Sequence, residues 1–256
     1  MPEQPDPASL VRIVWLDEID STNLEAQRRA AAGERGPLWL AARWQTAGRG
    51  RAGRAWQSSG GNLAATLLLA LDAAPVRLPE LSFVAALAAH DAIAQALADT
   101  PSTRHIRLKW PNDVLISGEK ICGILLETAH YGGTAVMMFG IGINVESAPD
   151  VAGRSVTALK AHGATVDATR ALQWLAAAME RWLSVWHSPA GFAAIRKAWL
   201  ARSLPLGAPM SIDPGSGPIR GTFAGLDNDG ALLLANDDGG TRRFTHGDVA
   251  IVPAKA

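Results

Sequence analysis

Residues 45–56 read QTAGRGRAGRAW, and residues 48–54 within them are three glycines, three arginines and one alanine. Glycine lets the backbone approach a ligand closely and present its N–H groups. Arginine adds a planar fork of donors that suits carboxylate and phosphate oxygens. The stretch therefore predicts a loop that is mobile alone and orders around an anionic ligand. It lacks the Gly-Lys-Ser/Thr ending of a P-loop, and a solvated basic loop or an RNA-binding tract stays open as an alternative.

A second group of polar residues is Lys109-Trp110-Pro111-Asn112-Asp113. The residues before it predict a strand over 105–110, and Pro111 ends that strand because proline cannot donate to the ladder. The strand end thus presents an ammonium, an indole, an amide and a carboxylate together. A purely structural turn is the alternative.

Three further segments combine polar residues with glycine or a helix start. Residues 21–23 are Ser-Thr-Asn after an acidic turn, and Ser21 suits the N-cap of a helix. Residues 120–127, KICGILLE, place a lysine before a buried strand in which Gly123 leaves room for a ligand. Residues 140–145, GIGINV, form a strand with internal glycines, which marks a bulge or close ligand approach. Capping, a solvated lysine and ordinary packing are the structural alternatives.

The composition limits the class of protein. The chain has 256 residues, is 48% hydrophobic, and balances 24 Lys and Arg against 24 Asp and Glu, so it predicts a globular fold without a broad basic field for DNA. The longest apolar run, residues 63–71, is too short to cross a membrane, and no signal peptide is expected. Cys122 stands alone and the histidines lack zinc spacing, so we expect a cytoplasmic protein with no protein-held metal.

Periodicity and turn residues predict an α+β fold. Strands are expected over 11–16, 38–43, 62–71, 105–110, 120–128 and 134–145, with Gly132-Gly133 as a hairpin turn. Helices are expected over 22–32, 79–99 and 167–187, with another reaching residue 203. After Pro205, short strands over 221–226, 231–235 and 241–245 alternate with Gly and Asp turns. This change predicts a small β-barrel after a boundary near residue 204.

Taken together, DSTN, QTAGRGRAGRAW, KWPNDV, KICGILLE and GIGINV, in this order between residues 20 and 145, resemble the motifs of the biotin protein ligase family. The resemblance implies a catalytic biotin- and ATP-binding domain over residues 1–203, related to class II aminoacyl-tRNA synthetases. It also implies an SH3-like C-terminal domain over residues 204–256. Members form biotinyl-5′-AMP from biotin and MgATP, then transfer biotin to a lysine of a biotin carboxyl carrier protein.

The resemblance also implies roles for individual residues. Biotin would be bound by Ser21, Thr22, Asn23, Gln45, Arg49, Gly50, Arg51, Lys120, Gly123 and Gly140. ATP would be bound by Arg49, Arg51, Trp56, Lys109, Asn112, Lys120 and Asn144, with Trp56 stacking on adenine. The catalytic residues would be Lys120, Arg51, Asp113 and Lys109, of which Asp113 receives or orients the acceptor lysine. Mg²⁺ would arrive with ATP.

Some relatives begin with a DNA-binding domain, whereas here the catalytic motif begins by Ser21, so no DNA binding is expected. Ala52 departs from the family pattern, because many relatives carry a basic residue there. A lipoate or octanoate ligase or transferase of the same fold is the alternative enzyme, and a non-catalytic biotin or nucleotide sensor is a further alternative. The sequence leaves monomer or homodimer open.

Overall fold

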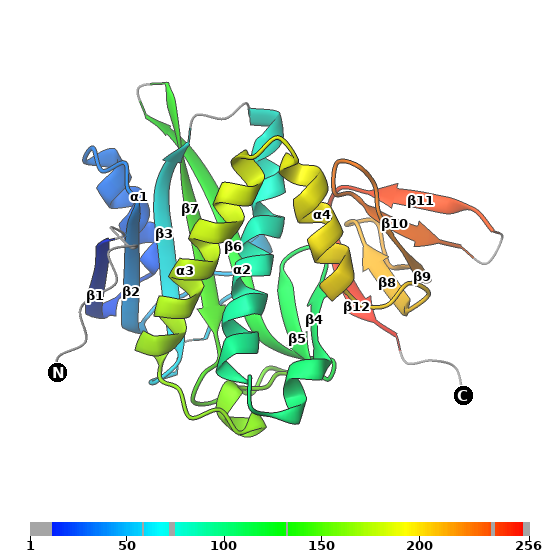
Figure 1. Cartoon of the computed structure of the whole chain (residues 1–256), viewed down its shortest axis with the longest axis horizontal. Coiled ribbons are helices and arrows are strands. Elements are labelled where there is room, and N and C mark those ends of the chain that lie inside the picture. The colour runs from blue at the N-terminus through cyan, green and yellow to red at the C-terminus, as the bar shows by residue number, and fades with distance from the viewer. Residues whose placement is uncertain (1–11, 58, 72–74, 132, 237–238, 253–256) are drawn as a thin grey trace.

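The computed structural model describes residues 12–57, 59–71, 75–131, 133–236 and 239–252. A seven-stranded sheet of order β1-β2-β3-β7-β6-β5-β4 runs through the larger part of the molecule (Figure 1). Its strands are β1 (Arg12–Ile19), β2 (Leu38–Gln45), β3 (Leu63–Leu71), β4 (Ile106–Lys109), β5 (Asp113–Ile116), β6 (Glu119–Tyr131) and β7 (Thr134–Ile143). The β1–β2 pair is parallel and the other pairs are antiparallel. Short connections explain the order of β4 to β7, whereas β3 pairs with β7 across a long stretch of sequence.

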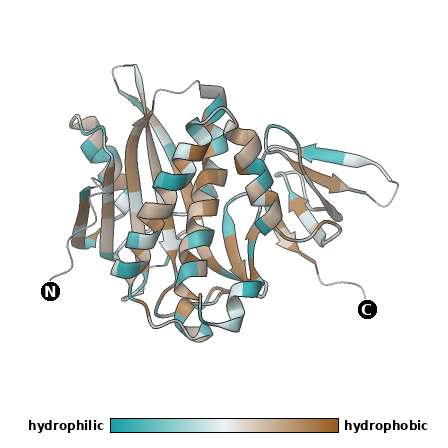
Figure 2. Cartoon of the chain, in the orientation of Figure 1, coloured by the Kyte–Doolittle hydropathy of each residue, from teal (hydrophilic) through white to brown (hydrophobic). Residues whose placement is uncertain are grey.

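Three helices cover one face of the sheet: α2 (Leu81–Ala96), α3 (Ala168–His187) and α4 (Gly191–Arg202). Helix α2 lies against β4 to β7, α3 packs on α2 and β3, and α4 packs on α2, α3 and β4. This sandwiched position explains the sequence of α2, which is apolar on nearly every side. Figure 2 shows the matching hydrophobic colour along β2 and β3.

The opposite face of the sheet is only partly covered. Helix α1 (Thr22–Ala31) packs there through Ala26 and Ala30 on side chains of β2, β3 and β7. Side chains alternate along a strand, so Met138, Gly140 and Gly142 of β7 share this face. Beyond α1 the face therefore carries glycine instead of a side chain, and a recess opens over β6 and β7.

A five-stranded antiparallel sheet of order β11-β10-β9-β8-β12 follows α4. Its strands are β8 (Pro209–Asp213), β9 (Ile219–Leu226), β10 (Leu232–Ala235), β11 (Thr241–Phe244) and β12 (Asp248–Ile251). It is tied to the larger sheet by Trp110, whose indole N–H donates to the Gly230 carbonyl at 3.1 Å, and by Lys109, whose ammonium donates to the Val249 carbonyl at 2.9 Å. Trp110 is thus buried and joins the two sheets.

The predicted α+β class and small C-terminal β unit are confirmed. The predicted boundary at 203/204 falls between α4 and β8, and the division into domains there stays a prediction. Strands β5, β8 and β12 were not predicted. Strand β5 begins at Asp113, within the segment interpreted as a turn, while β8 begins at Pro209 and β12 follows Gly247, residues that are typical of turns. Of the predicted Gly132-Gly133 turn, Gly132 lies outside the described residues. No helix in the described part of the chain has the length and apolar character to cross a bilayer.

Candidate functional site

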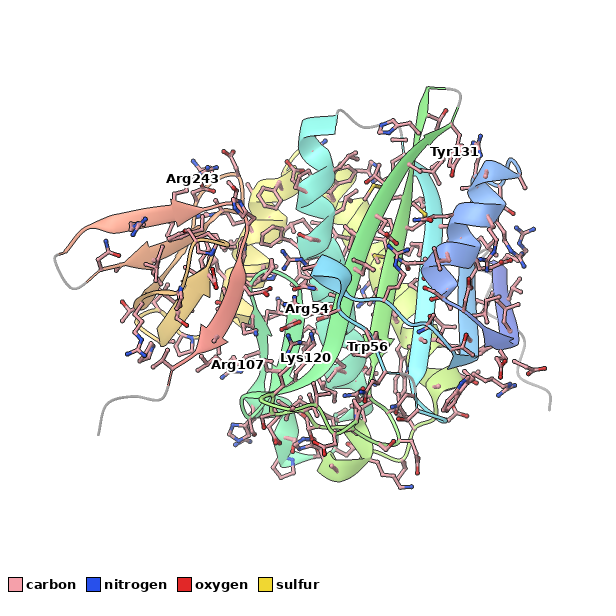
Figure 3. All side chains as sticks on the ribbon, turned by 180° about the vertical axis from the view of Figure 1, so that it is seen from behind. Arg54, Trp56, Arg107, Lys120, Tyr131 and Arg243 are labelled. Atoms are coloured by element: carbon pink, nitrogen blue, oxygen red, sulfur yellow. The ribbon has the colours of Figure 1, made fainter. Side chains whose placement is uncertain are left out.

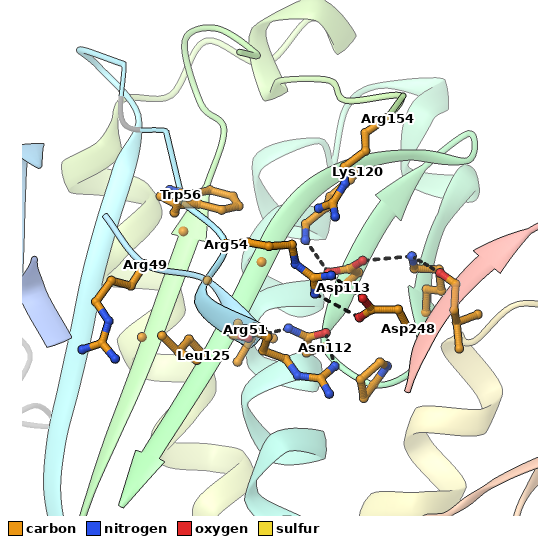
Figure 4. Close-up of a pocket in the computed structure, with 18 of the residues that line it drawn as sticks. Arg49, Arg51, Arg54, Trp56, Asn112, Asp113, Lys120, Leu125, Arg154 and Asp248 are labelled. Carbon is orange, nitrogen blue, oxygen red and sulfur yellow. Dashed lines mark hydrogen bonds and ion pairs between the residues drawn. The ribbon is translucent and has the colours of Figure 1, made fainter. Parts of the chain in front are cut away.

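The recess beyond α1 is a cavity of about 580 Å³. It is bounded by the start of α1, the Gly/Arg loop (residues 45–56), the ends of β5 to β7, residues 153–155 and the edge of the C-terminal sheet. Figure 3 shows Arg54, Trp56 and Lys120 gathered on this face, away from α2, and Figure 4 shows the cavity closer. All the site residues that the sequence predicts line it except Asn144.

One end of the cavity is a network of neutral polar groups. The Oε1 atom of Gln45 accepts hydrogen bonds from the backbone N–H of Thr22 at 2.8 Å and from its hydroxyl at 3.1 Å. The hydroxyl of Thr66 on β3 lies 2.8 Å from the Thr22 hydroxyl and donates to Asn23 Oδ1 at 2.6 Å. These side chains are buried, so the network holds each amide and hydroxyl in one orientation. It suits a neutral ligand group that both donates and accepts hydrogen bonds.

Ser21 occupies the N-cap position of α1, but its side chain makes no capping hydrogen bond. Its hydroxyl is nearly buried and lines the cavity beside Thr22. The capping explanation for this serine is therefore wrong, because the helix N–H groups do not use its oxygen.

Glu127 connects this network to the Gly/Arg loop. One carboxylate oxygen accepts from Asn23 Nδ2 at 2.8 Å, and the other accepts from Arg49 Nη2 at 2.8 Å. The guanidinium of Arg49 is thereby directed toward β6, away from Lys120 (Figure 4). Glu127 thus orients both an amide of the neutral end and the first arginine of the loop.

The floor of the cavity consists of backbone. A methyl group added to Gly140 would lie 2.3 Å from Asn23 Oδ1, and one added to Gly142 would lie 2.4 Å from the Trp56 ring. At Gly123 it would lie 2.8 Å from the same ring. Trp56 therefore lies flat on the two glycine strands, which is a contact that any larger residue would prevent.

The other end of the cavity is charged. Asp113, at the start of β5, pairs with Lys120 at 2.5 Å and with Lys109 at 3.0 Å. Burial alone would raise the pKa of this carboxyl, but the two ammonium groups outweigh burial and hold the pKa below its ordinary value. Asp113 is consequently ionised at neutral pH, and it fixes both lysine side chains.

Two arginines of the loop also reach this end. Arg51 donates to Asn112 Oδ1 at 3.2 Å and has no carboxylate within ion-pair distance among the described residues. Arg54 forms an ion pair with Asp248 of the C-terminal sheet, with Nη2 and Oδ1 3.0 Å apart. The hydrogen bond from Arg54 lowers the pKa of Asp248 and outweighs burial, which alone would raise it. Both sheets therefore contribute charged groups to one cavity.

Asn144 follows β7 but does not line the cavity. It is buried, and its Nδ2 atom donates to the Thr157 carbonyl at 2.9 Å. Its backbone N–H also donates to the Ile121 carbonyl at 2.9 Å. In this structure Asn144 holds residues 144–158 against β6, and its predicted contact with a nucleotide stays a prediction.

The motifs alone did not indicate Thr66, Glu127, Arg54 or Asp248 as site residues. Thr66 is the one polar residue within the apolar strand LAATLLLAL, a signal that could have found it. Glu127 ends KICGILLE and is a charge on a mostly apolar strand. Asp248 offers no such signal, because only the packing of the second sheet brings it to Arg54.

The cavity therefore has two chemically different ends. Among the described residues, six basic side chains line it and three acidic ones do: Arg49, Arg51, Arg54, Lys109, Lys120 and Arg154, against Asp113, Asp213 and Asp248. The positive excess suits a polyanion beside a neutral, hydrogen-bonding group. No group of three or more His, Cys, Asp or Glu that could hold a metal is found in the described ranges.

Comparisons with known proteins agree with this geometry. Residues 15–144 match the biotin/lipoate A/B protein ligase family, and residues 212–252 match the biotin protein ligase C-terminal domain. A biotin–[acetyl-CoA-carboxylase] ligase of Paracoccus denitrificans is 43% identical over 231 residues, which are 88% of this chain and 94% of the relative. One of Mycobacterium tuberculosis is 34% identical, covering 91% of this chain and 86% of the relative.

A solved structure is similar as well. The biotin protein ligase of Aquifex aeolicus in complex with biotin and ATP superposes with a TM-score of 0.78 at 26% identity. The superposition covers 94% of this chain and 99% of the other.

Proposed function

This chain belongs to the biotin/lipoate A/B protein ligase family, and from that premise we infer that it is a biotin protein ligase. Biotin and ATP are its substrates, and biotinyl-5′-AMP is the intermediate. The single observation that supports this most directly is the pairing of a rigid neutral network with an excess of positive charge in one cavity. Biotin has the same two ends, a ureido ring and a carboxylate, and the carboxylate must meet a triphosphate.

We assign the neutral end to the ureido ring. Thr22, Asn23 and Gln45, with Ser21 beside them, supply donors and acceptors in fixed directions. Thr66 and Glu127 act as positioning residues, because Thr66 hydrogen-bonds to the Thr22 hydroxyl and Glu127 accepts a hydrogen bond from the Asn23 side chain. A preorganised network of this kind loses little entropy when it binds a ligand.

The charged end promotes adenylation. A carboxylate is a poor nucleophile toward a triphosphate because both carry negative charge. Lys120 and Arg51 reduce this repulsion and stabilise the charge that builds on the α-phosphate as the new oxygen–phosphorus bond forms and pyrophosphate leaves. Asp113 holds both Lys120 and Lys109 in place through its two ion pairs, so a second positive charge lies beside Lys120. Trp56, Asn112 and Gly50 line the same end and complete the proposed nucleotide site.

In the second step the acceptor lysine attacks the mixed anhydride and AMP leaves. The amine must first lose its proton. Asp113 is the carboxylate of the cavity that pairs with Lys120, but its lowered pKa makes it a weak base. Each oxygen of Asp113 pairs with one lysine and keeps a further lone pair. We therefore propose that Asp113 accepts a hydrogen bond from the incoming amine and so orients it, and that the proton passes to solvent.

Mg²⁺ fits this site as a companion of ATP. Both oxygens of Asp113 are taken by lysines, and the unpaired Oδ1 of Asn144 lies outside the cavity lining. The residues present therefore suit a magnesium ion that is carried by the phosphates and by water, which is its usual state with nucleotides. When bound, it would neutralise part of the phosphate charge.

The acceptor we propose is a lysine of a biotin carboxyl carrier domain, as the names of the relatives suggest. A lipoate ligase is less favoured, because the apolar dithiolane of lipoate would cover this polar end of the cavity without offering it any hydrogen bonds. ATP as substrate and the free, buried thiol of Cys122 suit the cytoplasm.

The test is biotin-dependent release of pyrophosphate by the purified chain with MgATP. We expect release with biotin, none with lipoate, and incorporation of biotin into a purified carrier domain. Release that is driven equally by lipoate, or no release with either acid, would refute the proposed function.

Ligand binding should also protect the Gly/Arg loop from trypsin. In the free protein its arginines are held by partly exposed contacts, which contribute little stability. Phosphate and carboxylate oxygens would add charge-assisted hydrogen bonds, so cleavage after Arg49, Arg51 and Arg54 should slow by at least about tenfold with biotin and ATP. Mass spectrometry of timed digests measures each site. Cleavage after the exposed Arg242, outside the cavity, serves as the internal control, and equal loop cleavage with and without ligands would contradict closure.

A further inference from the structure

Arg154 lines the cavity although none of the sequence motifs includes it. It lies in the segment between β7 and a short 3₁₀ turn (Leu159–His162), and its side chain is exposed. Figure 4 shows it directed into the cavity from the side where Lys120 lies. No side-chain hydrogen bond or ion pair within the described residues occupies its guanidinium.

The backbone fixes Arg154 close to Lys120. The N–H of Lys120 donates to the Ser155 carbonyl at 2.9 Å, and its carbonyl accepts from the Thr157 N–H at 2.9 Å. Val156 pairs with Lys120 as in a parallel ladder. Arg154 directly precedes Ser155, so it lies next to the backbone of Lys120, and the side chains of both residues line the cavity.

The start of the same segment is held as firmly. Asn62 Oδ1 accepts hydrogen bonds from the backbone N–H groups of Val145, Glu146 and Ser147, at 2.9 to 3.2 Å. Arg154 is therefore presented on an anchored backbone and does not depend on the Gly/Arg loop for its position. A cation held in this way contributes to binding without a large ordering cost.

The charges around Arg154 favour the binding of an anion. The cavity lining has three more basic than acidic side chains. The positive charge of Arg154 helps to lower the pKa of Asp248, but that carboxylate is already paired with Arg54. Arg154 lies at the exposed side of the cavity, whereas Lys120 reaches the glycine floor beside Trp56. A triphosphate whose α-phosphate meets Lys120 would extend toward Arg154.

We propose that Arg154 binds the β- and γ-phosphates of ATP and stabilises pyrophosphate as it leaves. This inference rests on the proposed ligase function and adds a residue to it. Negative charge shifts onto the leaving group as the bond from the α-phosphorus to the bridging oxygen breaks, so a guanidinium there acts mainly in the transition state. Its planar fork suits two phosphate oxygens at once.

The test uses Arg154→Ala and Arg154→Lys in the whole chain. We expect kcat/KM for ATP in biotin-dependent pyrophosphate release to fall by about 10- to 100-fold in Arg154→Ala, the effect of losing charge-assisted hydrogen bonds. Arg154→Lys should recover part of it, because the charge remains and the fork is lost. Arg107→Ala, an exposed arginine outside the cavity, is the matched control, and circular dichroism confirms folding.

A second measurement separates this role from contact with the acceptor or from misfolding. Chemically made biotinyl-5′-AMP has no β- or γ-phosphate, so Arg154→Ala should transfer biotin from it to the carrier at the wild-type rate. Slower transfer, a raised KM for the carrier, or unchanged kcat/KM for ATP would each overturn the assignment. An inactive wild-type chain would instead refute the proposed function itself.

Discussion

Lys120→Ala should slow formation of biotinyl-5′-AMP by roughly 10²-fold or more, because it removes a positioned and mostly buried charge from the site. The protein should still fold, since Asp113 keeps its ion pair with Lys109 at 3.0 Å. Biotin binding should change much less, because the neutral network does not involve Lys120. Single-turnover pyrophosphate release and calorimetry with biotin measure the two effects.

Lys160→Ala is the control for Lys120→Ala. Lys160 also pairs with a carboxylate, that of Glu146, but it is exposed and lies outside the cavity lining. Its loss should leave adenylation unchanged. Wild-type adenylation by Lys120→Ala, or an equal defect in the control, would remove the role assigned to Lys120.

Gly140→Ala should weaken biotin binding by roughly 10- to 100-fold, the usual range for overpacking a close contact. The new methyl group would lie 2.3 Å from Asn23 Oδ1. Asn23 cannot move aside without losing its bonds to Thr66 and Glu127. The ureido end should therefore lose its geometry, while binding of ATP alone is little affected. Calorimetric titration with each substrate measures this selectivity.

The matched control is Gly60→Ala, where an added methyl group meets no atom within 4 Å and the backbone needs no positive φ. It should bind biotin like the wild type and unfold at the same temperature within error. If Gly140→Ala bound biotin normally as well, the floor of the cavity could not be the biotin site.

The sequence by itself was sufficient for the family and for a set of site residues that all line the cavity except Asn144. Gly140, Gly123 and Gly48 are required by close approach of neighbouring atoms, and Gly53 by its positive φ, and such positions leave a local pattern in the sequence. Lysine, asparagine and aspartate in KWPND remain adjacent on the chain, so one turn brings Lys109 and Asp113 together at 3.0 Å. The main helices and the longer strands also followed from local periodicity.

Only the tertiary structure decided which charges face one another. Asp113 binds Lys120, Arg49 binds Glu127 and Arg54 binds Asp248, although the last two residues are 194 positions apart. The structure also shows that Asn144 lies outside the cavity lining and that Arg154 lies beside Lys120. The physical reason is that periodicity and turn chemistry act over a few residues, whereas an ion pair depends on where two distant backbones are brought together by packing.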